Sequence, residues 1–510
     1  MKAIIHKRLY NWHSLTGLIS TVLLVALCLT ALPAIFMKDI SQWLTPTQTI
    51  TPLSEYQSVD RWLEQADEQL NLAGKEFHIR SNIDSQPYTL WTSQNDTFTA
   101  FVQNSEGMFV SHHSASAAKV LAEVHHNFLL PDPYGEYLVG LLGLAMLALV
   151  FMGVLLHKKW KKEKTQLRAH RSRRLLLSDL HKVLGLWLLP FHIFVSYTGA
   201  TLGLGSLLLI VAALSAFNGE QDAAVAAVFG EEPTLSMQTC AMQSPSALAQ
   251  SANQHWQDKY GNNQITDIEI HGWKDCNAQI TIASAIPGYL LNSNAVSYSL
   301  TSGELINEID WIPGGFGERW YALLGPLHFG TYAGYISQWL FFVSALLLAV
   351  MMVSGMLLWL NKRNQSLEKS WFIKTCTGTS LGIAMASISL LFVATLQNLF
   401  FSDSAFSIST YKLTYAASFL CTFMICVARL KSWLLISRLI AFMYLLTPLI
   451  HAYFFDLDQS TLAVQLTFLA VSAVFFTLPS LINNYTQTNT ADITIPDENG
   501  KTTSDSQQAI

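Results

Sequence analysis

Long apolar stretches separated by polar segments are the main pattern along this chain. A helix needs about 20 apolar residues to cross the hydrocarbon core of a bilayer. Eight stretches reach that length and predict membrane-spanning helices at 12–34, 134–157, 180–201, 335–360, 372–398, 410–428, 434–454 and 461–482. A further apolar stretch, 201–217, is interrupted by Gly203 and Gly205. We predict that it continues the preceding helix or lies at the outer interface without spanning.

The composition agrees with a membrane protein. Of the 510 residues, 51% are hydrophobic and only 13% are charged, which is too apolar for a soluble chain of this length. The net charge of −5 is informative only through where the charges lie. We therefore expect the lipid bilayer, and no nucleic acid, among the partners.

The positive charges orient the predicted spans, because short loops rich in Lys and Arg stay in the cytoplasm. The loop 157–174 has a single acidic residue and nine basic ones: Lys158, Lys159, Lys161, Lys162, Lys164, Arg168, Arg171, Arg173 and Arg174. Basic residues also follow the fourth span, separate the sixth from the seventh and precede the first. The loops near Asp403 and Asp456–Asp458 are acidic and then lie outside. This pattern predicts a multi-pass membrane protein with both termini cytoplasmic.

Two polar regions, 39–133 and 218–330, are predicted to lie outside. Each opens with a helical pattern, continues in short strand-like runs and has a glycine in a late turn, which is typical of a small α+β unit. The runs are Phe77–Arg80, Tyr88–Trp91 and Phe98–Val102, then Ile265–His271, Gln279–Ala283 and Val296–Leu300. Their histidines, His78, His255 and His271, have no spacing that suggests a site, and we interpret them as surface or packed residues.

The cysteines leave one question open. Cys240 and Cys276 are the only cysteines in the outer regions, where an oxidising compartment permits a disulfide; two free thiols fit the sequence equally well. The other four, Cys28, Cys376, Cys421 and Cys426, lie in or beside apolar spans. No CxxC or CxxCH motif occurs, so the sequence encodes neither a zinc ribbon nor a covalently attached c-type haem.

The first 360 residues repeat a pattern of histidine, glycine and threonine. His13, Gly17 and Thr30 recur as His181, Gly185 and Thr198, at an offset of 168 residues; His126 stands 27 residues before Gly153, as His328 stands 27 before Gly355. An ionisable group in a membrane segment is costly, so repeated histidines are functional candidates. The first span begins like a signal peptide, but we predict that it is a retained helix, because its motif matches the third span.

The charge pattern gives these histidines depths. His13 and His181 fall near the cytoplasmic ends of spans one and three, whereas His126 and His328 fall just outside spans two and four. Each level thus offers two imidazoles and few other ligands. Zinc prefers four protein ligands, whereas a haem supplies four nitrogens itself and needs only one or two axial groups. We therefore predict two b-type haems with these four histidines as axial ligands.

Several alternatives stay open on the outer side. His192 follows His181 by eleven residues, which returns to nearly the same face of a straight helix, and His125 competes with His126. Gly17 and Gly185 could let a flat ring approach the backbone, or simply allow close helix packing. His451, alone in span seven, is interpreted as a polar packing residue.

These motifs resemble the PepSY-associated transmembrane family, which includes ferric-siderophore reductases and other iron-regulated inner-membrane proteins. The resemblance covers roughly residues 5–363 and rests on four groups of residues: Trp12-His13 with Gly17, His126 with Gly135 and Gly140, Asp179, His181 and Gly185 with Thr198-Gly199, and Leu327-His328 with Gly330 and Ser354-Gly355. It implies a protein of the bacterial inner (plasma) membrane. It also implies a four-helix core with PepSY-like outer domains and, in the reductase members, two haems held by histidines.

The resulting fold is a mainly α-helical polytopic membrane protein with about eight transmembrane helices, the first four forming two repeated pairs, plus small α+β (PepSY-like) periplasmic domains. The expected parts are a first helix at 1–38, outer regions at 39–133 and 202–333, helices two and three at 134–201, helix four at 334–363, a four-helix extension at 364–484 and a disordered cytoplasmic tail at 485–510.

The expected function is a di-haem conduit that reduces ferric iron in a periplasmic siderophore or other ferric chelate. The sequence contains no dinucleotide fingerprint, so the electron donor would be quinol or a separate reductase. Two other functions are open: a membrane-anchored binding or regulatory protein without redox chemistry, and a transporter. The repeated halves favour the transporter, whereas the lack of paired acidic residues within the spans argues against it.

Overall fold

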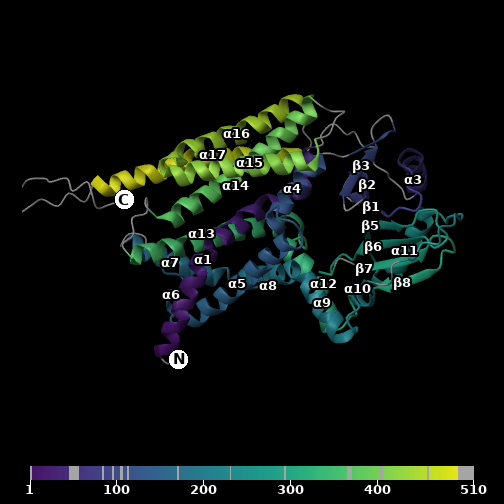
Figure 1. The fold of residues 1–510 in the computed structure, drawn as a ribbon, viewed down its shortest axis with the longest axis horizontal. Coiled ribbons are helices and arrows are strands. Elements are labelled where there is room, and N and C mark those ends of the chain that lie inside the picture. Colours follow the sequence, from purple (N-terminus) through teal and green to yellow (C-terminus); the bar gives the residue numbers. More distant parts are fainter. Residues whose placement is uncertain are drawn as a thin grey trace, which may run out of the picture. The chain divides into compact units, whose positions relative to one another are not determined.

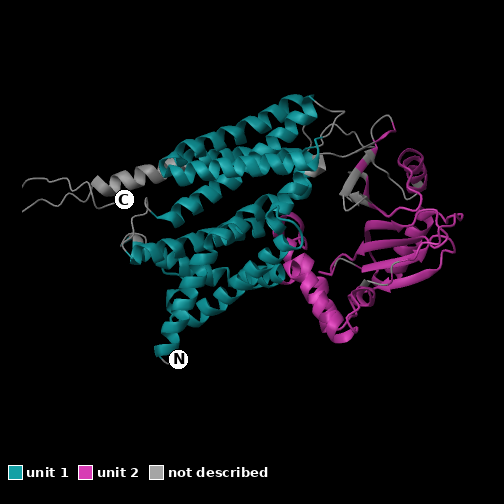
Figure 2. Ribbon diagram, viewed as in Figure 1, with its two compact units in different colours: residues 1–46, 116–200, 338–510 teal, residues 47–115, 201–337 magenta. Residues whose placement is uncertain are grey.

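The computed structural model describes residues 3–491, apart from 45–56, 83–85, 95–96, 104–106, 112–113, 169–171, 230, 232, 292–293, 364–369, 401–405 and 456–458. It contains two compact units (Figure 2). Unit 1 comprises residues 1–46, 116–200 and 338–510, and unit 2 comprises residues 47–115 and 201–337. The first outer region expected from the sequence, 39–133, is therefore longer than its part in unit 2. The reason is that α2 (Met37–Trp43) and most of α4 (Ser114–Asn127) belong to unit 1.

Unit 1 is a bundle of helices (Figure 1). Besides α2 and α4, its helices are α1 (Ala3–Ile35), α5 (Tyr134–Leu156), α6 (Trp160–Glu163), α7 (Arg173–Trp187), α8 (Leu189–Gly203), α13 (Gly334–Lys362), α14 (Trp371–Phe400), α15 (Ile408–Ala428), α16 (Trp433–Phe454) and α17 (Gln459–Ala491). The α7–α8 pair and α13 each extend a few residues into unit 2.

Six described helices are long and apolar enough to cross a membrane: α1, α5, α13, α14, α15 and the α16 segment. The α7–α8 pair makes a seventh if it counts as one span. The eighth expected span, 461–482, falls in α17, whose described apolar part is the shorter Thr461–Thr477. The segment 201–217 contains α9 (Gly205–Ala216), which is too short to cross a bilayer, as its glycines predicted. The expected tail begins later than 485, because α17 continues to Ala491; residues beyond it lie outside the described part.

The third predicted span differs from a straight helix. It bends by 70° between Trp187 and Leu189. Pro190 lies in the first turn of α8, where its ring blocks the position of a helix carbonyl four residues earlier and its nitrogen cannot donate. The face shared by His181 and His192 in a straight helix is therefore lost, because the two histidines lie on differently directed segments.

The four C-terminal helices do not form a separate module. α14 packs against α1, α15 and α16, and α17 packs against α16 and α2. A buried cluster joins Trp43 of α2 and the following Leu44 with α4, α14, α15 and α17. The α4 residues in it include Ala117 and Leu121. The expected extension at 364–484 is thus an integral part of the bundle.

Unit 2 contains one eight-stranded antiparallel sheet in the order β4-β3-β2-β1-β5-β6-β7-β8. The strands are β1 (Phe77–Asn82), β2 (Gln86–Gln94), β3 (Thr97–Gln103), β4 (Phe109–Ser111), β5 (Gln264–His271), β6 (Gln279–Ala285), β7 (Asn294–Ser299) and β8 (Leu305–Ile309). All six strands predicted from the sequence are present. The two outer regions are not separate domains, because β1 of the first pairs with β5 of the second.

The two faces of this sheet have opposite character. Side chains alternate along a strand, so Phe77, Ile79, Ile268 and Ile270 point to one face, where all four are buried. The helices α3 (Gln57–Leu70) and α11 (Pro245–Tyr260) pack on that face through Trp62, Leu63 and Trp256, among others. The intervening positions of β1 and β5 are polar. Unit 2 also contains α10 (Gln221–Phe229) and α12 (Phe316–Phe329).

Cys240 and Cys276 form a disulfide, which answers the question that the sequence left open. Cys28, Cys376, Cys421 and Cys426 are free thiols on α1, α14 and α15.

Candidate functional site

The equivalent histidines of the two repeats meet in unit 1. His13 on α1 and His181 on α7 are 168 positions apart, yet their ring centroids lie 6.2 Å from each other with planes at 73°. Both side chains are partly buried in the bundle. The expected inner pair is therefore one local site formed by both halves of the repeat.

The glycines of the repeat face these two histidines. A Cβ added to Gly153 of α5 would lie 3.5 Å from Cε1 of His13, and a Cβ added to Gly355 of α13 would lie 2.9 Å from both Cε1 and Nδ1 of His181. Each imidazole therefore packs against a helix backbone from which the side chain is missing. This explains why these glycines recur at the same positions in the two repeats.

One hydrogen bond decides which ring nitrogen of His181 carries the proton. Nδ1 of His181 lies 3.0 Å from the carbonyl oxygen of Met351. Because a carbonyl can only accept, Nδ1 carries the proton and Nε2 keeps its lone pair, which is the arrangement of a metal-ligating histidine. In the other repeat, the backbone of Leu149, equivalent to Met351, lies beside His13, whose Nδ1 is buried without a hydrogen-bond partner among the described residues.

Gly17 and Gly185 serve helix packing instead. A Cβ on Gly17 would lie 3.7 Å from Cδ2 of Leu149, and one on Gly185 would lie 3.5 Å from Sδ of Met351. These are ordinary van der Waals distances to a neighbouring helix. Of the two interpretations of these glycines, the contacts favour close helix packing.

The outer candidates of unit 1 have different environments. His126 is about half exposed, and its Nε2 lies 2.9 Å from Oε1 of Glu136; with Asp132 these residues form a cluster whose ligand atoms all lie within 4.8 Å. His125 points the other way, with Nδ1 at 3.2 Å from Oγ1 of Thr30. His192 is 1% exposed, and its Nε2 has no hydrogen-bond partner in the described part of the chain.

The repeat extends to the helices that carry the outer histidines. His126 is the second-last residue of α4, just before α5, and His328 is the second-last residue of α12, just before α13. His328 belongs to unit 2 and His126 to unit 1. Their pairing at one haem therefore stays a prediction.

His451 is a packing residue, as the sequence suggested. Its Nε2 lies 2.6 Å from the carbonyl of Trp43 and its Nδ1 lies 3.0 Å from the amide of Gln465. The ring stacks on the Trp43 indole at 4.2 Å between centroids. Both ring nitrogens are thus used in joining α16 to α2 and α17.

A buried carboxylate fixes the basic loop to the helix of His181. Asp179 is 2% exposed and accepts hydrogen bonds from the backbone N–H, Nε and Nη2 of Arg168 at 2.9, 2.9 and 2.6 Å. Lys182 of the same helix pairs with Glu163 at 2.8 Å. The loop is therefore held on both sides of His181, a role that its Lys and Arg content alone did not reveal.

Six described helices are long and apolar enough to span a membrane, and two insertions between them form one α+β unit. These features define a polytopic membrane protein with an additional α+β domain. The PepSY-associated transmembrane region matches residues 10–362, which is more than half of the chain, so the chain belongs to this family. The resemblance seen in the sequence is confirmed.

A relative has been found in Pseudomonas aeruginosa. This uncharacterized protein is 28% identical over 268 residues, which cover 48% of the present chain and 64% of the relative. The match thus spans less than two thirds of that protein's length.

Proposed function

We propose that the protein is a di-haem inner-membrane electron conduit that reduces ferric iron in periplasmic siderophore complexes for iron uptake. The observation that supports it most is the facing pair of His13 and His181. Two bonds of about 2 Å from a metal to two imidazole nitrogens, together with the ring radii, span roughly 6 Å between ring centres. The residues present therefore fit a metal ion held between two imidazoles.

Haem b is the cofactor that this donor set suits. His13 and His181 would be its axial ligands, and carboxylate or thiolate ligands are not placed with them among the described contacts. With both axial positions filled, haem b supplies one-electron transfer rather than oxygen chemistry. The Met351 carbonyl fixes the tautomer of His181, and Gly153 and Gly355 let both imidazoles pack against helix backbones.

A second haem would use histidines nearer the other end of the bundle. The repeat favours His126 and His328, whereas burial favours His125 and His192. His192 has an unpartnered buried Nε2 in the described structure, which makes it the strongest alternative. The proposed topology, with both termini and the basic loop cytoplasmic, would put this second site on the periplasmic side.

The proposed reaction is the one-electron reduction of chelated Fe(III), with quinol or a separate reductase as donor. The oxygen donors of a siderophore hold Fe(III) far more tightly than Fe(II), so the added electron releases the metal without breaking the chelator.

The test is a dithionite-reduced minus oxidised spectrum of the purified full-length protein, with haem counted per chain. We expect two b-type haems, and one after His13→Ala or His181→Ala. The matched control is His255→Ala, a histidine of unit 2 that pairs with Glu308 and should leave the count unchanged. Single replacements at His125, His126, His192 and His328 then identify the ligands of the second haem.

Absence of haem would refute the conduit and leave a membrane-anchored binding or regulatory protein. Haem without reduction of a ferric siderophore would keep electron transfer and remove the proposed substrate.

A further inference from the structure

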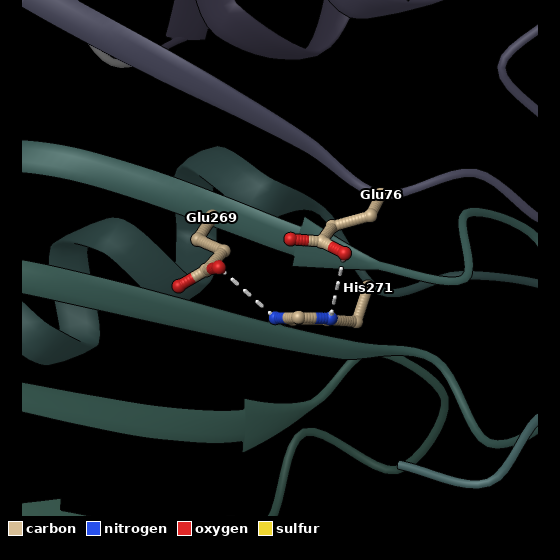
Figure 3. Close-up of side chains that lie close together, drawn as sticks. All are labelled: Glu76, Glu269 and His271. Carbon is tan, nitrogen blue, oxygen red and sulfur yellow. Dashed lines mark ion pairs between the residues drawn. The ribbon is translucent and has the colours of Figure 1, made fainter. Parts of the chain in front are cut away.

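Strands β1 and β5 bring a second group of chemically active side chains together in unit 2, on the sheet face opposite the hydrophobic core. His78 of β1 lies directly across from Glu269 of β5 in the antiparallel register. Asp267 and His271 flank Glu269 on the same face, and Glu76 precedes β1. Figure 3 shows how the imidazole of His271 lies between the carboxylates of Glu76 and Glu269.

The side chains alternate between carboxylate and imidazole. Nε2 of His271 lies 3.1 Å from Oε1 of Glu269, and Nε2 of His78 lies 3.5 Å from the same oxygen. The other ring nitrogens face the outer carboxylates: Nδ1 of His78 is 3.0 Å from Asp267, and Nδ1 of His271 is 3.9 Å from Glu76. Ligand atoms of Glu76, Glu269 and His271 all lie within 4.8 Å of one another.

This arrangement matches the way proteins prepare histidines as metal ligands. A ligating imidazole usually donates its second N–H to a carboxylate, which fixes the tautomer and makes the ligating nitrogen more basic. Asp267 is placed to do this for His78. The lone pair on Nε2 of His78 is then directed toward Glu269, where Nε2 of His271 also points. A mixture of imidazole and carboxylate ligands suits first-row transition cations better than Mg²⁺ or Ca²⁺, which prefer oxygen alone.

Charge and access also favour a cation. Three carboxylates surround two imidazoles, so these five groups stay net negative even with both imidazoles protonated. The side chains of His78 and His271 are each 20% exposed, and that of Glu269 is 28% exposed, so an ion can reach them from solvent. Neither repeat contains all five of these side chains. Glu76 and His78 come from the first repeat, and Asp267, Glu269 and His271 come from the second.

We propose that Glu76, Glu269 and His271, assisted by His78, form a binding site for one divalent first-row transition cation at the junction of the two repeats. Asp267 orients His78 by accepting its Nδ1–H. These residues belong to unit 2, whereas His13 and His181 belong to unit 1. The proposed cation site therefore does not depend on the proposed function.

The test uses full-length protein in detergent, purified with an affinity tag that contains no histidine and stripped with a chelator. All variants carry His126→Ala, which removes the other described His–carboxylate cluster, that of His126, Asp132 and Glu136. Zn²⁺ binding is measured by equilibrium dialysis, and the visible spectrum of bound Co²⁺ reports the ligand set. We expect one site per chain, lost in His271→Ala and in Glu269→Gln.

The size of the effect on Zn²⁺ binding distinguishes the roles of Asp267 and His78. Asp267→Asn should weaken Zn²⁺ binding about 10- to 100-fold, as is usual for a residue that orients a ligand. His78→Ala should weaken it at least as much, because Asp267 acts through His78, and should also change the Co²⁺ spectrum. His255→Ala, which removes a histidine paired with Glu308 elsewhere in the unit, is the matched control and should have no effect. Thermal unfolding of each variant shows whether unit 2 still folds.

Equal Zn²⁺ binding by the parent and by folded His271→Ala and Glu269→Gln proteins would overturn the proposal. The cluster would then be a ladder of imidazolium–carboxylate ion pairs. The haem count of the protein that retains His126 is an independent readout, so failure of the conduit and failure of this site are distinguishable.

Discussion

Two glycines determine how closely the helix backbones approach the paired histidines His13 and His181. Gly355 and Gly153 occupy equivalent positions, but a Cβ would meet His181 at 2.9 Å in the first case and His13 at 3.5 Å in the second. Only the first distance is too short for a normal contact. The two glycines therefore form a matched pair for measuring how much close approach matters at this site.

We expect Gly355→Ala to displace the His181 ring, lower the haem content and cost about 1–3 kcal/mol of stability through overpacking. Gly153→Ala should change both quantities little, because its added methyl group makes an ordinary contact. Haem per chain and thermal unfolding in detergent would measure these effects. Equal losses in both variants would contradict the close contact at Gly355.

Asp275 in unit 2 gives a prediction about pH. Burial favours its neutral form, but hydrogen bonds from the backbone of Asn277, from the backbone and hydroxyl of Ser236 and from the backbone of Met237 outweigh this and lower the pKa of the carboxyl. The ionised form thus stabilises the fold above the unfolded pKa of about 3.9. That contribution is lost as the pH falls through the lower folded value.

Asp275→Asn should therefore lower the unfolding temperature of unit 2 at pH 7, and the difference from the parent should shrink as the pH falls below about 4. A melting series from neutral to acidic pH measures this. Asp258→Asn, an exposed site on α11, is the control. A difference that is constant with pH would show that the charge of Asp275 contributes nothing.

Among the elements, the basic loop 157–174 is attached to α7 by charged contacts. Arg168 reaches Asp179 with three donors, and Asp179 stands two residues before His181. Removal of the guanidinium leaves a carboxylate that is 2% exposed with one described donor, the backbone N–H. The loop therefore contributes to the position of α7.

Arg168→Ala should lower the unfolding temperature of unit 1, since a buried charged acceptor loses its side-chain donors. Lys158→Ala, an exposed residue of the same loop, should stay within about 0.5 kcal/mol of the parent. Thermal unfolding in detergent is the measurement. If the two variants have the same stability, the Arg168–Asp179 contact adds nothing to the fold.

At the scale of the whole molecule, both units are built by joining two repeats. In unit 1 the repeats contribute His13 and His181, and in unit 2 they contribute β1 and β5, whose pairing makes one sheet from two α+β halves. Ile270 lies in this junction, fully buried and opposite Phe77. The junction should therefore couple the stability of the two halves.

Ile270→Ala should cost about 2–5 kcal/mol through the cavity that it leaves, and hydrogen exchange should accelerate in β1 as well as in β5 and β6. Ile306→Ala, on the edge strand β8 where the side chain is 50% exposed, is the matched control. Faster exchange confined to the second half would mean that the halves open independently.

Much of this architecture was predictable because its signals are local. The length of an apolar stretch predicts a span, and the six strand-like runs predicted from the sequence are six of the eight strands in the sheet. Repetition identified the histidines, although the bend at Pro190 invalidated the argument that placed His192 on the face of His181. His78 gave no signal, because it acquires Asp267 and Glu269 only through strand pairing with residues about 190 positions away. His271 has Glu269 beside it in its own strand, but this pair meets His78 only when β1 and β5 pair.

The sequence by itself determined the membrane class, the family, the α+β order of the outer regions and the set of repeated histidines, since transfer free energy and periodicity depend on neighbouring residues. Only the tertiary structure decided that His13 faces His181, that Gly355 and not Gly185 contacts that ring, that the cysteines join, and that β1 and β5 create the His–carboxylate cluster. These outcomes depend on contacts between distant segments, which side-chain packing and strand register select.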